Sequence, residues 1–344
     1  MAELLEGGNP LEFRGLLAND FRKQKPRLDL GRLFFFAMDP ARLTQLHFLL
    51  AADGRIRWGL MAAIASILKT LPEGQRAKIT VVDGGIPVDL IARLKSQFTD
   101  NSKEIEFVPF RWPDGCEAPA LEGSRLTYAR LCAADLIESD ICVYVDADIV
   151  VRSDLSPLFA RARADNSAPV WAARNRPDDS FHSQLGRQSA ELVAGVPSNE
   201  LYFNAGFLVI NLARWRELNV AKLGFDLAAK YQFISHDQDA LNVLFRGHWK
   251  ELEDRWNYQL IDRTTFPADT AVLHYSGRNK PWHSGYPTRV LTPFKQALKA
   301  AGWPRWRAPF SLKEWLRNSR WRPFFSSLQY RLRRARGLEG IERR

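Results

Sequence analysis

The sequence has few cysteines and no long apolar run. Its 344 residues include three cysteines, Cys116, Cys132 and Cys142, an odd number with no C-x-x-C pair. This usage argues against a disulfide framework and indicates a reducing compartment. The first residues lack the basic and then apolar layout of a signal peptide. The most apolar stretches, Leu33–Met38 and Leu46–Ala52, are far shorter than the roughly 20 residues that span a bilayer. We therefore predict a cytoplasmic protein that does not cross a membrane.

Common nucleotide-binding motifs are absent too. The chain contains no G-x-x-x-x-G-K-[ST] loop, no G-x-G-x-x-G after a predicted strand and no G-x-S-x-G elbow. Nucleotide binding of the P-loop or Rossmann dinucleotide type therefore has no support.

Positive charge is concentrated at one end of the chain. The formal net charge is +10, and residues 301–344 carry twelve Lys/Arg against three Asp/Glu, which leaves residues 1–300 nearly neutral. Four of the eleven tryptophans lie in the same segment. The basic character thus belongs to an appendage, and no nucleic-acid partner is expected for the main body.

Strand-like and helix-like segments alternate from residue 46 onward. Leu46–Ala52, Lys78–Asp83 and Ile105–Val108 are predicted as buried strands, and residues from about Trp58 to Lys69 and Val88–Phe98 have apolar positions at helical spacing. This alternation predicts an α/β fold, with a mostly parallel central sheet and helices on both faces. Ligands of such sheets bind beyond the carboxyl ends of the strands.

The later part of the chain gives weaker signals. We predict helices over Tyr128–Ile137 and Asp237–Phe245 and an apolar strand over Phe203–Leu212. Residues Arg174–Glu200 are polar with little periodicity, which is typical of a loop or lid.

The apolar run Ile141–Val151 contains two carboxylates, Asp146 and Asp148. A buried strand cannot hold such a pair without a partner, because an unpaired buried charge costs several kcal/mol. A hard divalent cation is the natural partner. Asp53 and Asp83 also follow predicted strands, so they are expected on the same rim, although both could instead cap turns.

A second polar group, His274–Trp282, follows the predicted strand Ala271–Leu273. His274 is a possible metal ligand, Gly277 allows a close backbone approach, and Lys280 offers a charge for a phosphate. Taken singly, each has a structural explanation. Together with the acid pair they form a coherent metal and diphosphate clamp.

Seven segments in order carry a family resemblance: Leu50–Asp53, Val82–Gly85, Thr127–Leu131, Val145–Asp148, Tyr202–Gly206, Asp237–Asn242 and His274–Trp282. The chain resembles the family 8 glycosyltransferases, retaining enzymes of the GT-A fold that use nucleotide sugars. It is most similar to the bacterial lipopolysaccharide galactosyl- and glucosyltransferases. The resemblance implies a GT-A catalytic domain, which we place over residues 46–300. From their composition and charge, residues 1–45 are interpreted as an N-terminal extension and residues 301–344 as a basic, aromatic-rich tail.

The resemblance also implies the roles of individual residues. Asp146, Asp148 and His274 would hold Mn²⁺ or Mg²⁺, Gly277 and Lys280 would contact the diphosphate of a UDP-sugar, and Ala51 and Asp53 its uracil and ribose. The transferred galactose or glucose would be surrounded by Arg130, Asn204, Ala205, Asp237 and Gln238, of which Gln238 and Asp237 are the candidate catalytic residues.

The expected reaction transfers the hexose to a saccharide acceptor, in lipopolysaccharide core or another lipid-linked glycan. A double displacement needs a carboxylate nucleophile below the sugar. The closest candidate, Gln238, is an amide and a poor nucleophile, with Asp237 beside it, so attack from the face of the leaving group is favoured.

The basic tail is predicted to be helical and to attach the protein to an anionic membrane surface. Leu312, Trp315 and Leu316 lie at helical spacing, and further arginines follow Pro323. Aromatic residues beside arginine suit an amphipathic helix on a bilayer, which would place the protein peripherally on the inner face of the membrane. A helix packed on the body with a solvated basic face is the alternative.

Two other functions remain open from the sequence. A Mg²⁺-dependent phosphohydrolase would use Asp146 as nucleophile, which leaves His274–Trp282 unexplained. A non-catalytic peripheral membrane protein with a degenerate GT-A fold would not be expected to keep Asp146, Asp148, His274 and Lys280.

Overall fold

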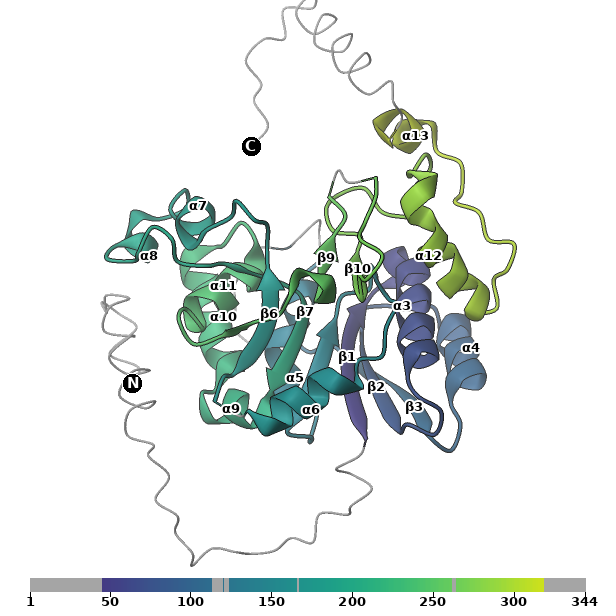
Figure 1. The fold of residues 1–344 in the computed structure, drawn as a ribbon, viewed down its shortest axis with the longest axis horizontal. Coiled ribbons are helices and arrows are strands. Elements are labelled where there is room, and N and C mark those ends of the chain that lie inside the picture. Colours follow the sequence, from purple (N-terminus) through teal and green to yellow (C-terminus); the bar gives the residue numbers. More distant parts are fainter. Residues whose placement is uncertain (1–44, 113–119, 121–123, 166, 262–263, 319–344) are drawn as a thin grey trace, which may run out of the picture.

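A seven-stranded sheet forms the centre of the molecule, in the order β3-β2-β1-β4-β7-β6-β8 (Figure 1). The computed structural model describes residues 45–112, 120, 124–165, 167–261 and 264–318. The strands of this sheet are β1 Leu46–Ala52, β2 Ala77–Asp83, β3 Lys103–Pro109, β4 Ile141–Val145, β6 Val170–Arg174, β7 Phe203–Asn211 and β8 Lys250–Glu251. Only β7 runs antiparallel to its neighbours β4 and β6. The prediction of a mostly parallel sheet is therefore confirmed.

A second, three-stranded sheet contains β5 Ile149–Val151, β10 Val272–His274 and β9 Tyr258–Gln259. The middle strand, β10, is antiparallel to β5 and parallel to β9. The apolar run that looked like a single strand in the sequence is thus divided between two sheets. The acid pair lies in the turn where the chain passes from one sheet to the other.

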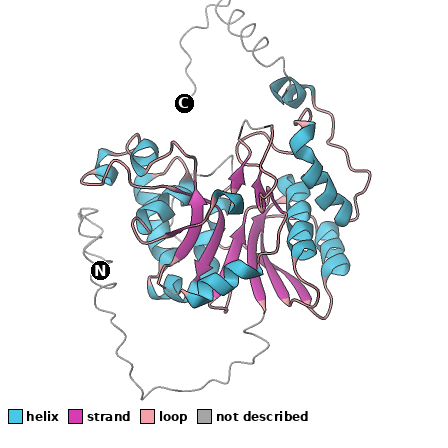
Figure 2. Ribbon diagram, viewed as in Figure 1, coloured by secondary structure: helices cyan, strands magenta, loops and turns pink. Residues whose placement is uncertain are grey.

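Helices cover both faces of the large sheet (Figure 2). The α-helices are α3 Arg57–Thr70, α4 Val88–Phe98, α5 Ala133–Leu136, α6 Ser156–Ala164, α7 Phe181–Leu185, α8 Ala190–Val193, α9 Leu212–Glu217, α10 Val220–Tyr231, α11 His236–Leu244, α12 Thr288–Ala300 and α13 Leu312–Asn318, and the 3₁₀ helices are η2 Gly54–Ile56, η3 Leu126–Cys132 and η4 Asp254–Trp256.

Strand alternation produces the two hydrophobic layers. In β1, Phe48 and Leu50 join the core beneath α3, α4, α6 and α12, whereas Leu49 and Ala51 join the core beneath η3, α9, α10 and α11. Successive side chains of a strand point to opposite faces, so a run that is apolar throughout needs cover on both sides. Burying each large apolar side chain contributes roughly 1.5–3 kcal/mol.

Two segments differ from the prediction. The helix expected over Tyr128–Ile137 is a 3₁₀ helix, η3, followed by the short α5. Arg130 Nε donates a hydrogen bond to the Thr127 carbonyl at 3.1 Å. In an α-helix this carbonyl would accept from the backbone amide of Leu131.

The polar segment Arg174–Glu200 is the second difference, because it contains the two short helices α7 and α8. Ser180 caps α7 through a capping box. A small separate hydrophobic cluster is formed by Phe181, Leu185 and Leu192 together with Tyr202 and Phe233. These contacts come from distant parts of the chain, so no regular period marks them in the sequence.

The chain after α12 returns to the body of the molecule. The ring centroid of Trp58 on α3 lies 5.1 Å from that of Trp303 and 5.8 Å from that of Trp306. Ser284 then joins α13 to the body, since its backbone amide donates to Glu314 at 3.1 Å. Residues 319–344 and, apart from Gln45, the predicted N-terminal extension lie outside the described residues.

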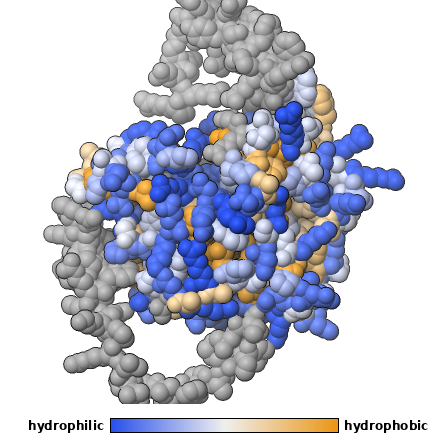
Figure 3. Space-filling view, viewed as in Figure 1, coloured by the Kyte–Doolittle hydropathy of each residue, from blue (hydrophilic) through white to orange (hydrophobic). Residues whose placement is uncertain are grey.

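Hydrophilic residues predominate on the face seen in Figure 3, with apolar residues in small patches. Within the described ranges, three of the five exposed large apolar side chains, Phe310, Leu312 and Trp315, lie in α13 or just before it. Among all the described residues, no helix is both long and apolar enough to cross a bilayer.

Candidate metal centre and active site

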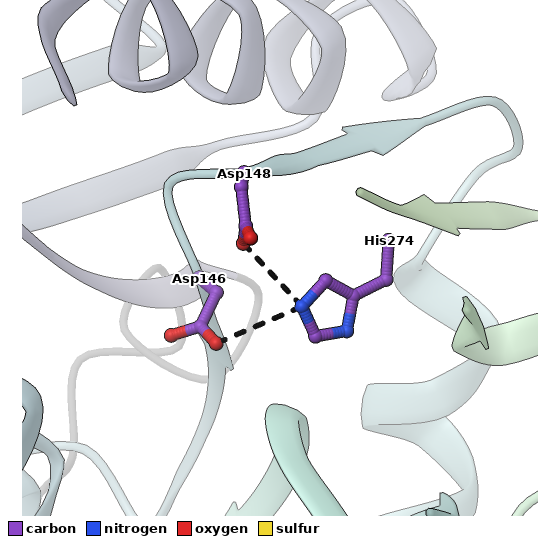
Figure 4. Close-up of side chains that lie close together, drawn as sticks. All are labelled: Asp146, Asp148 and His274. Carbon is purple, nitrogen blue, oxygen red and sulfur yellow. Dashed lines mark ion pairs between the residues drawn. The ribbon is translucent and has the colours of Figure 1, made fainter. Parts of the chain in front are cut away.

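Two carboxylates and one imidazole meet where the two sheets join (Figure 4). Asp146 directly follows β4, Asp148 precedes β5, and His274 is the last residue of β10. One potential ligand atom from each lies within 4.8 Å of the others. His274 Nε2 is 3.4 Å from Asp148 Oδ1 and 3.9 Å from Asp146 Oδ2. The structure therefore brings together the three residues predicted as metal ligands.

Backbone hydrogen bonds hold the acid turn in place. The Asp146 amide donates to the Gly206 carbonyl at 2.8 Å, and the Tyr275 amide donates to the Asp148 carbonyl at 2.9 Å. One bond ties the turn to β7 of the large sheet and the other ties it to the end of β10 in the small sheet. The positions of the two carboxylates thus depend on how the sheets meet.

Two glycines leave room for this turn. A Cβ on Gly206 would run into the His274 ring and lie 2.8 Å from Asp146 Oδ2. A Cβ on Gly59 of α3 would collide with the carbonyl of Ala147 and lie 2.5 Å from the Trp282 ring. Any side chain at either position must displace the acid turn or its neighbours.

Lys280 lies beside the second acid. Its ammonium forms an ion pair with Asp148 Oδ2 and donates to the Tyr275 carbonyl at 3.1 Å. Burial raises the pKa of Asp148, but the charge of the neighbouring Lys280 ammonium outweighs it, and the pKa lies well below its usual range. Asp148 is therefore a carboxylate at neutral pH.

Arg130 of η3 links the first acid to α11. Its guanidinium is buried, with Nη2 3.0 Å from Asp146 Oδ1 and Nε 2.7 Å from Asp237 Oδ2. It also lies over the ring of Tyr144, 4.3 Å from the centroid. The Tyr144 hydroxyl donates to Asp146 Oδ1 at 2.8 Å. Asp146 thus has two buried donors before any ion binds.

Asp237 is a buried acid that shares its cation. It is 2 % exposed, accepts a hydrogen bond from the Thr127 hydroxyl, and pairs with Arg130. Burial raises the pKa of Asp237 to about 6, against the opposing effects of Arg130 and Thr127. Burial thus outweighs the ion pair at Asp237, and the nearby Asp146 carboxylate raises the pKa further.

Three predicted sugar-site residues form one amide network. Gln238 Oε1 accepts from the Ala205 amide at 2.9 Å and from Asn204 Nδ2 at 3.1 Å, and Gln238 Nε2 donates to the Tyr202 hydroxyl at 3.1 Å. The neighbouring Asp239 has a structural role instead, because its carboxylate accepts from the backbone amide of Ser235 at 2.7 Å. Of the two acids in the first turn of α11, Asp239 therefore stabilises the helix start, whereas Asp237 pairs with Arg130.

The other predicted acids lie on the same sheet edge. Asp53 follows β1 and Asp83 ends β2, and both strands run parallel to β4. Asp53 accepts from the Arg55 amide at 2.9 Å, and Asp83 accepts from the Gly85 amide at 2.8 Å. Both thus cap turns, as the structural alternative anticipated. Ala51 is buried, and Gly277 has φ of +88°, a conformation that favours glycine.

The side chains present fit a divalent cation. Two carboxylate oxygens suit Mg²⁺ or Mn²⁺, and an imidazole nitrogen beside them is compatible with a transition metal such as Mn²⁺. The missing Cβ at Gly206 keeps space open between Asp146 and His274. Sequence reasoning missed Tyr144, Thr127 and Asn257, which contact the site. Thr127 lies in one of the resemblance segments but was given no role, and no motif marks Tyr144 or Asn257; only their hydrogen bonds reveal all three.

Comparison with known proteins adds an independent finding. The family model described as Glycosyl transferase family 8 matches residues 47–285. General stress protein A of Bacillus subtilis is 26% identical over 264 residues, which cover 70% of this chain and 88% of that protein. A lipopolysaccharide 1,3-galactosyltransferase of Salmonella typhimurium is 30% identical over 191 residues, 52% of this chain and 55% of the relative. The crystal structure of the galactosyltransferase LgtC with donor and acceptor sugar analogues superimposes with a TM-score of 0.60 at 25% identity, covering 81% of this chain and 99% of LgtC.

Replacing Gly206 by alanine tests the metal centre. We expect Gly206→Ala to weaken Mn²⁺ binding by at least about tenfold, because the added methyl displaces His274 or Asp146 and packed sites do not absorb such a shift freely. Mn²⁺ titration followed by electron paramagnetic resonance measures the dissociation constant. Leu208→Ala, a core truncation on the same strand, should lower stability and leave Mn²⁺ affinity unchanged; equal affinities in all three proteins would contradict the assignment.

Asp237 should make stability depend on pH. A carboxyl whose pKa is raised in the folded state contributes stability that is fully present below the unfolded pKa of 3.8 and is lost as the pH rises through about 6. Asp237→Asn should make this slope shallower between about pH 4 and pH 6, as measured by urea unfolding. Burial also raises the pKa of Asp239, so part of the slope remains in the variant. The slope from Asp148 has the opposite sign and lies below this window, so an undiminished slope in Asp237→Asn would refute the raised pKa of Asp237.

Proposed function

The chain belongs to glycosyl transferase family 8, and on that premise we propose that it is a retaining hexosyltransferase that moves galactose or glucose from a UDP-sugar to a saccharide acceptor. Membership of the family makes the protein a glycosyltransferase, and its fold is the GT-A fold. The donor, the metal, the acceptor and the residue roles are our proposal.

One observation carries the proposal more than any other. Asp146, Asp148 and His274 converge at the carboxyl ends of the parallel strands, with Lys280 on one side and the Arg130–Asp237 pair on the other. Ligands of open α/β sheets bind at this edge. A nucleoside diphosphate and the hexose attached to it need both a cationic and a hydrogen-bonding region, and the two adjoin here.

Asp146, Asp148 and His274 would hold Mn²⁺ or Mg²⁺. A bound ion of this kind supplies Lewis acidity at the diphosphate. Lys280 and the backbone at Gly277 would contact the same diphosphate, and Lys280 already lies within reach of Asp148. Its charge would offset part of the negative charge that develops on the leaving group. Ala51 and Asp53, at the end of β1, would contact the uracil and ribose.

The donor hexose would lie against Arg130, Asn204, Ala205, Asp237 and Gln238. The hydrogen bonds among these residues support attack from the face of the leaving group. Gln238 Oε1 already accepts two hydrogen bonds, and Asp237 is held by Arg130 and Thr127. Neither is a free carboxylate nucleophile. The leaving phosphate oxygen would then accept the proton of the acceptor hydroxyl as the new glycosidic bond forms.

The acceptor would enter beside Asn257. A cavity of about 600 Å³ there is lined by Asn175, Tyr258 and Gln259 among others, and by three carboxylates against two arginines. Asn175 Oδ1 accepts from Asn204 Nδ2 at 3.0 Å, which connects this wall to the sugar network. Amides, one aromatic ring and a slight negative balance suit a neutral saccharide better than a phosphorylated one.

A lipid-linked acceptor, such as lipopolysaccharide core, is consistent with attachment to a membrane surface. Phe310, Leu312 and Trp315 are exposed together in or just before α13, and the segment that follows is rich in arginine. We include in the proposal that this patch and the basic tail bind anionic lipid on the inner face of the membrane.

UDP-dependent stabilisation separates the proposed transferase from the alternatives. Mn²⁺ with UDP should stabilise the protein by about 2.7 kcal/mol when the ligand is at a hundred times its dissociation constant. Stabilisation by inorganic phosphate alone would indicate the phosphohydrolase instead, and no stabilisation by either would indicate the non-catalytic protein. A screen of UDP-sugars, with product analysis, then identifies the donor.

Asp148→Asn should abolish both the UDP-dependent stabilisation and turnover. Asp154→Asn is the matched control, because Asp154 caps the turn before α6, where it accepts from the Ser156 amide at 2.9 Å and from the Ser156 hydroxyl. Retained UDP binding in Asp148→Asn would exclude the proposed donor site.

Binding to vesicles tests the membrane proposal. Phe310→Ser with Trp315→Ser, and separately a chain ending at Asn318, should each bind vesicles containing phosphatidylglycerol at least about tenfold more weakly, because each basic residue near an anionic surface contributes about 1 kcal/mol and each aromatic adds buried area. Val88→Ser removes an equally exposed apolar residue on α4 and should have no effect. Undiminished co-sedimentation of both altered proteins would rule the proposal out.

A further inference from the structure

Asn257 lies between η4 and β9 and belongs to no motif that the sequence revealed. It is 2 % exposed, and its side-chain amide contacts two functional residues. Asn257 Nδ2 donates to Asn204 Oδ1 at 2.8 Å, and Asn257 Oδ1 is 2.9 Å from His274 Nδ1. One buried side chain therefore touches both a candidate metal ligand and the candidate sugar site.

A backbone amide determines the direction of each hydrogen bond in the series from Asn204 through Asn257 to His274. The Gly206 amide donates to Asn204 Oδ1 at 3.0 Å, so this atom must be the carbonyl oxygen. Asn257 must then present its NH₂ group to Asn204 and its oxygen to His274. Because that oxygen only accepts, the hydrogen of the imidazole lies on Nδ1.

This tautomer leaves Nε2 of His274 with a free electron pair. Nε2 is the nitrogen that faces the acids, 3.4 Å from Asp148 Oδ1. A histidine binds metals through its unprotonated nitrogen, and the hydrogen bond on the other nitrogen determines which one that is. A backbone amide of β7 thus determines, through two side-chain amides, which nitrogen of His274 faces the acids.

The same series of hydrogen bonds continues from Asn204 to the candidate sugar site. Asn204 Nδ2 donates to Gln238 Oε1 at 3.1 Å, and the Ala205 amide fixes the orientation of Gln238 in the same way, at 2.9 Å. Loss of Asn257 would leave Asn204 Oδ1 with the Gly206 amide alone and His274 Nδ1 without its acceptor. The lost hydrogen bonds would therefore affect both the candidate metal site and the candidate sugar site.

We propose that Asn257 is a positioning residue that sets the metal-binding tautomer of His274 and couples this imidazole to Asn204 and Gln238. The inference rests on the proposed function, in that it takes Asp146, Asp148 and His274 to be metal ligands. A buried asparagine with a purely structural role would affect stability and neither the tautomer nor metal affinity.

The tautomer can be measured without metal or substrate. Long-range ¹H–¹⁵N spectra at pH 8 distinguish Nδ1–H from Nε2–H for each of the six histidines, and His274→Gln assigns the signal of interest. We expect Nδ1–H in the wild type and a mixture in Asn257→Ala. An Nε2–H tautomer of His274 in the wild-type protein would overturn the proposal, whatever the variants do.

Two variants separate the two contacts of Asn257. Asn257→Ala removes both, so Mn²⁺ affinity should fall about 10- to 100-fold, as is typical for such supporting groups. Asn257→Asp keeps an acceptor for His274 and removes the donor to Asn204. It should bind Mn²⁺ as tightly as the wild type or more tightly, while kcat for UDP-sugar turnover falls and KM changes less.

Asn211→Ala is the control for stability, because Asn211 is a buried asparagine at the far end of β7 that accepts from the Arg214 amide at 3.1 Å. It should unfold more easily with unchanged Mn²⁺ affinity. Wild-type Mn²⁺ affinity in Asn257→Ala would overturn the proposal. If the wild type binds Mn²⁺ with the Nδ1–H tautomer but turns over no UDP-sugar, the proposed function fails and the inference on Asn257 stands.

Discussion

Two carboxylates held in one short turn between buried strands repel each other, and the surrounding structure places a cationic side chain against each of them. Asp148 has Lys280, and Asp146 has Arg130 and the hydroxyl of Tyr144. Removing ions from water costs several kcal/mol each, so a buried acid without such partners would take up a proton. Asp237 shows this limit, since it shares one arginine with Asp146 and its pKa rises.

The same constraint explains why the site lies at a junction. A single continuous strand would place Asp146 and Asp148 on one face of a sheet. Here the chain leaves β4 of the large sheet and enters β5 of the small sheet. The turn between these strands brings both acids towards His274 on β10. The hydrogen bonds to Gly206 and Tyr275 fasten this turn to both sheets. The geometry of the acid and histidine cluster is thus determined by the packing of two sheets.

Most of the fold and about half of this site could be predicted from the sequence. β1 and α4 have the bounds that their apolar spacing predicted, because such spacing reports local geometry. The acid pair and His274 stood out because charge in apolar surroundings is costly. Asn257 and Tyr144 did not, since their importance comes from partners that only the folded chain brings near. The 3₁₀ form of η3 also escaped prediction; there Arg130 Nε donates to the Thr127 carbonyl, a contact that the sequence does not reveal.

Gly59 and Gly206 stand on opposite sides of the acid turn, and neither leaves space for a side chain. Any side chain added at either glycine would displace the turn itself or the rings of His274 and Trp282 beside it. If the proposed donor site is right, variation in the accepted sugar would fall to side chains that reach the pocket from elsewhere, such as the amides on β7 and α11. Directed evolution of specificity would then find the acid turn closed to change and the positions around those amides open.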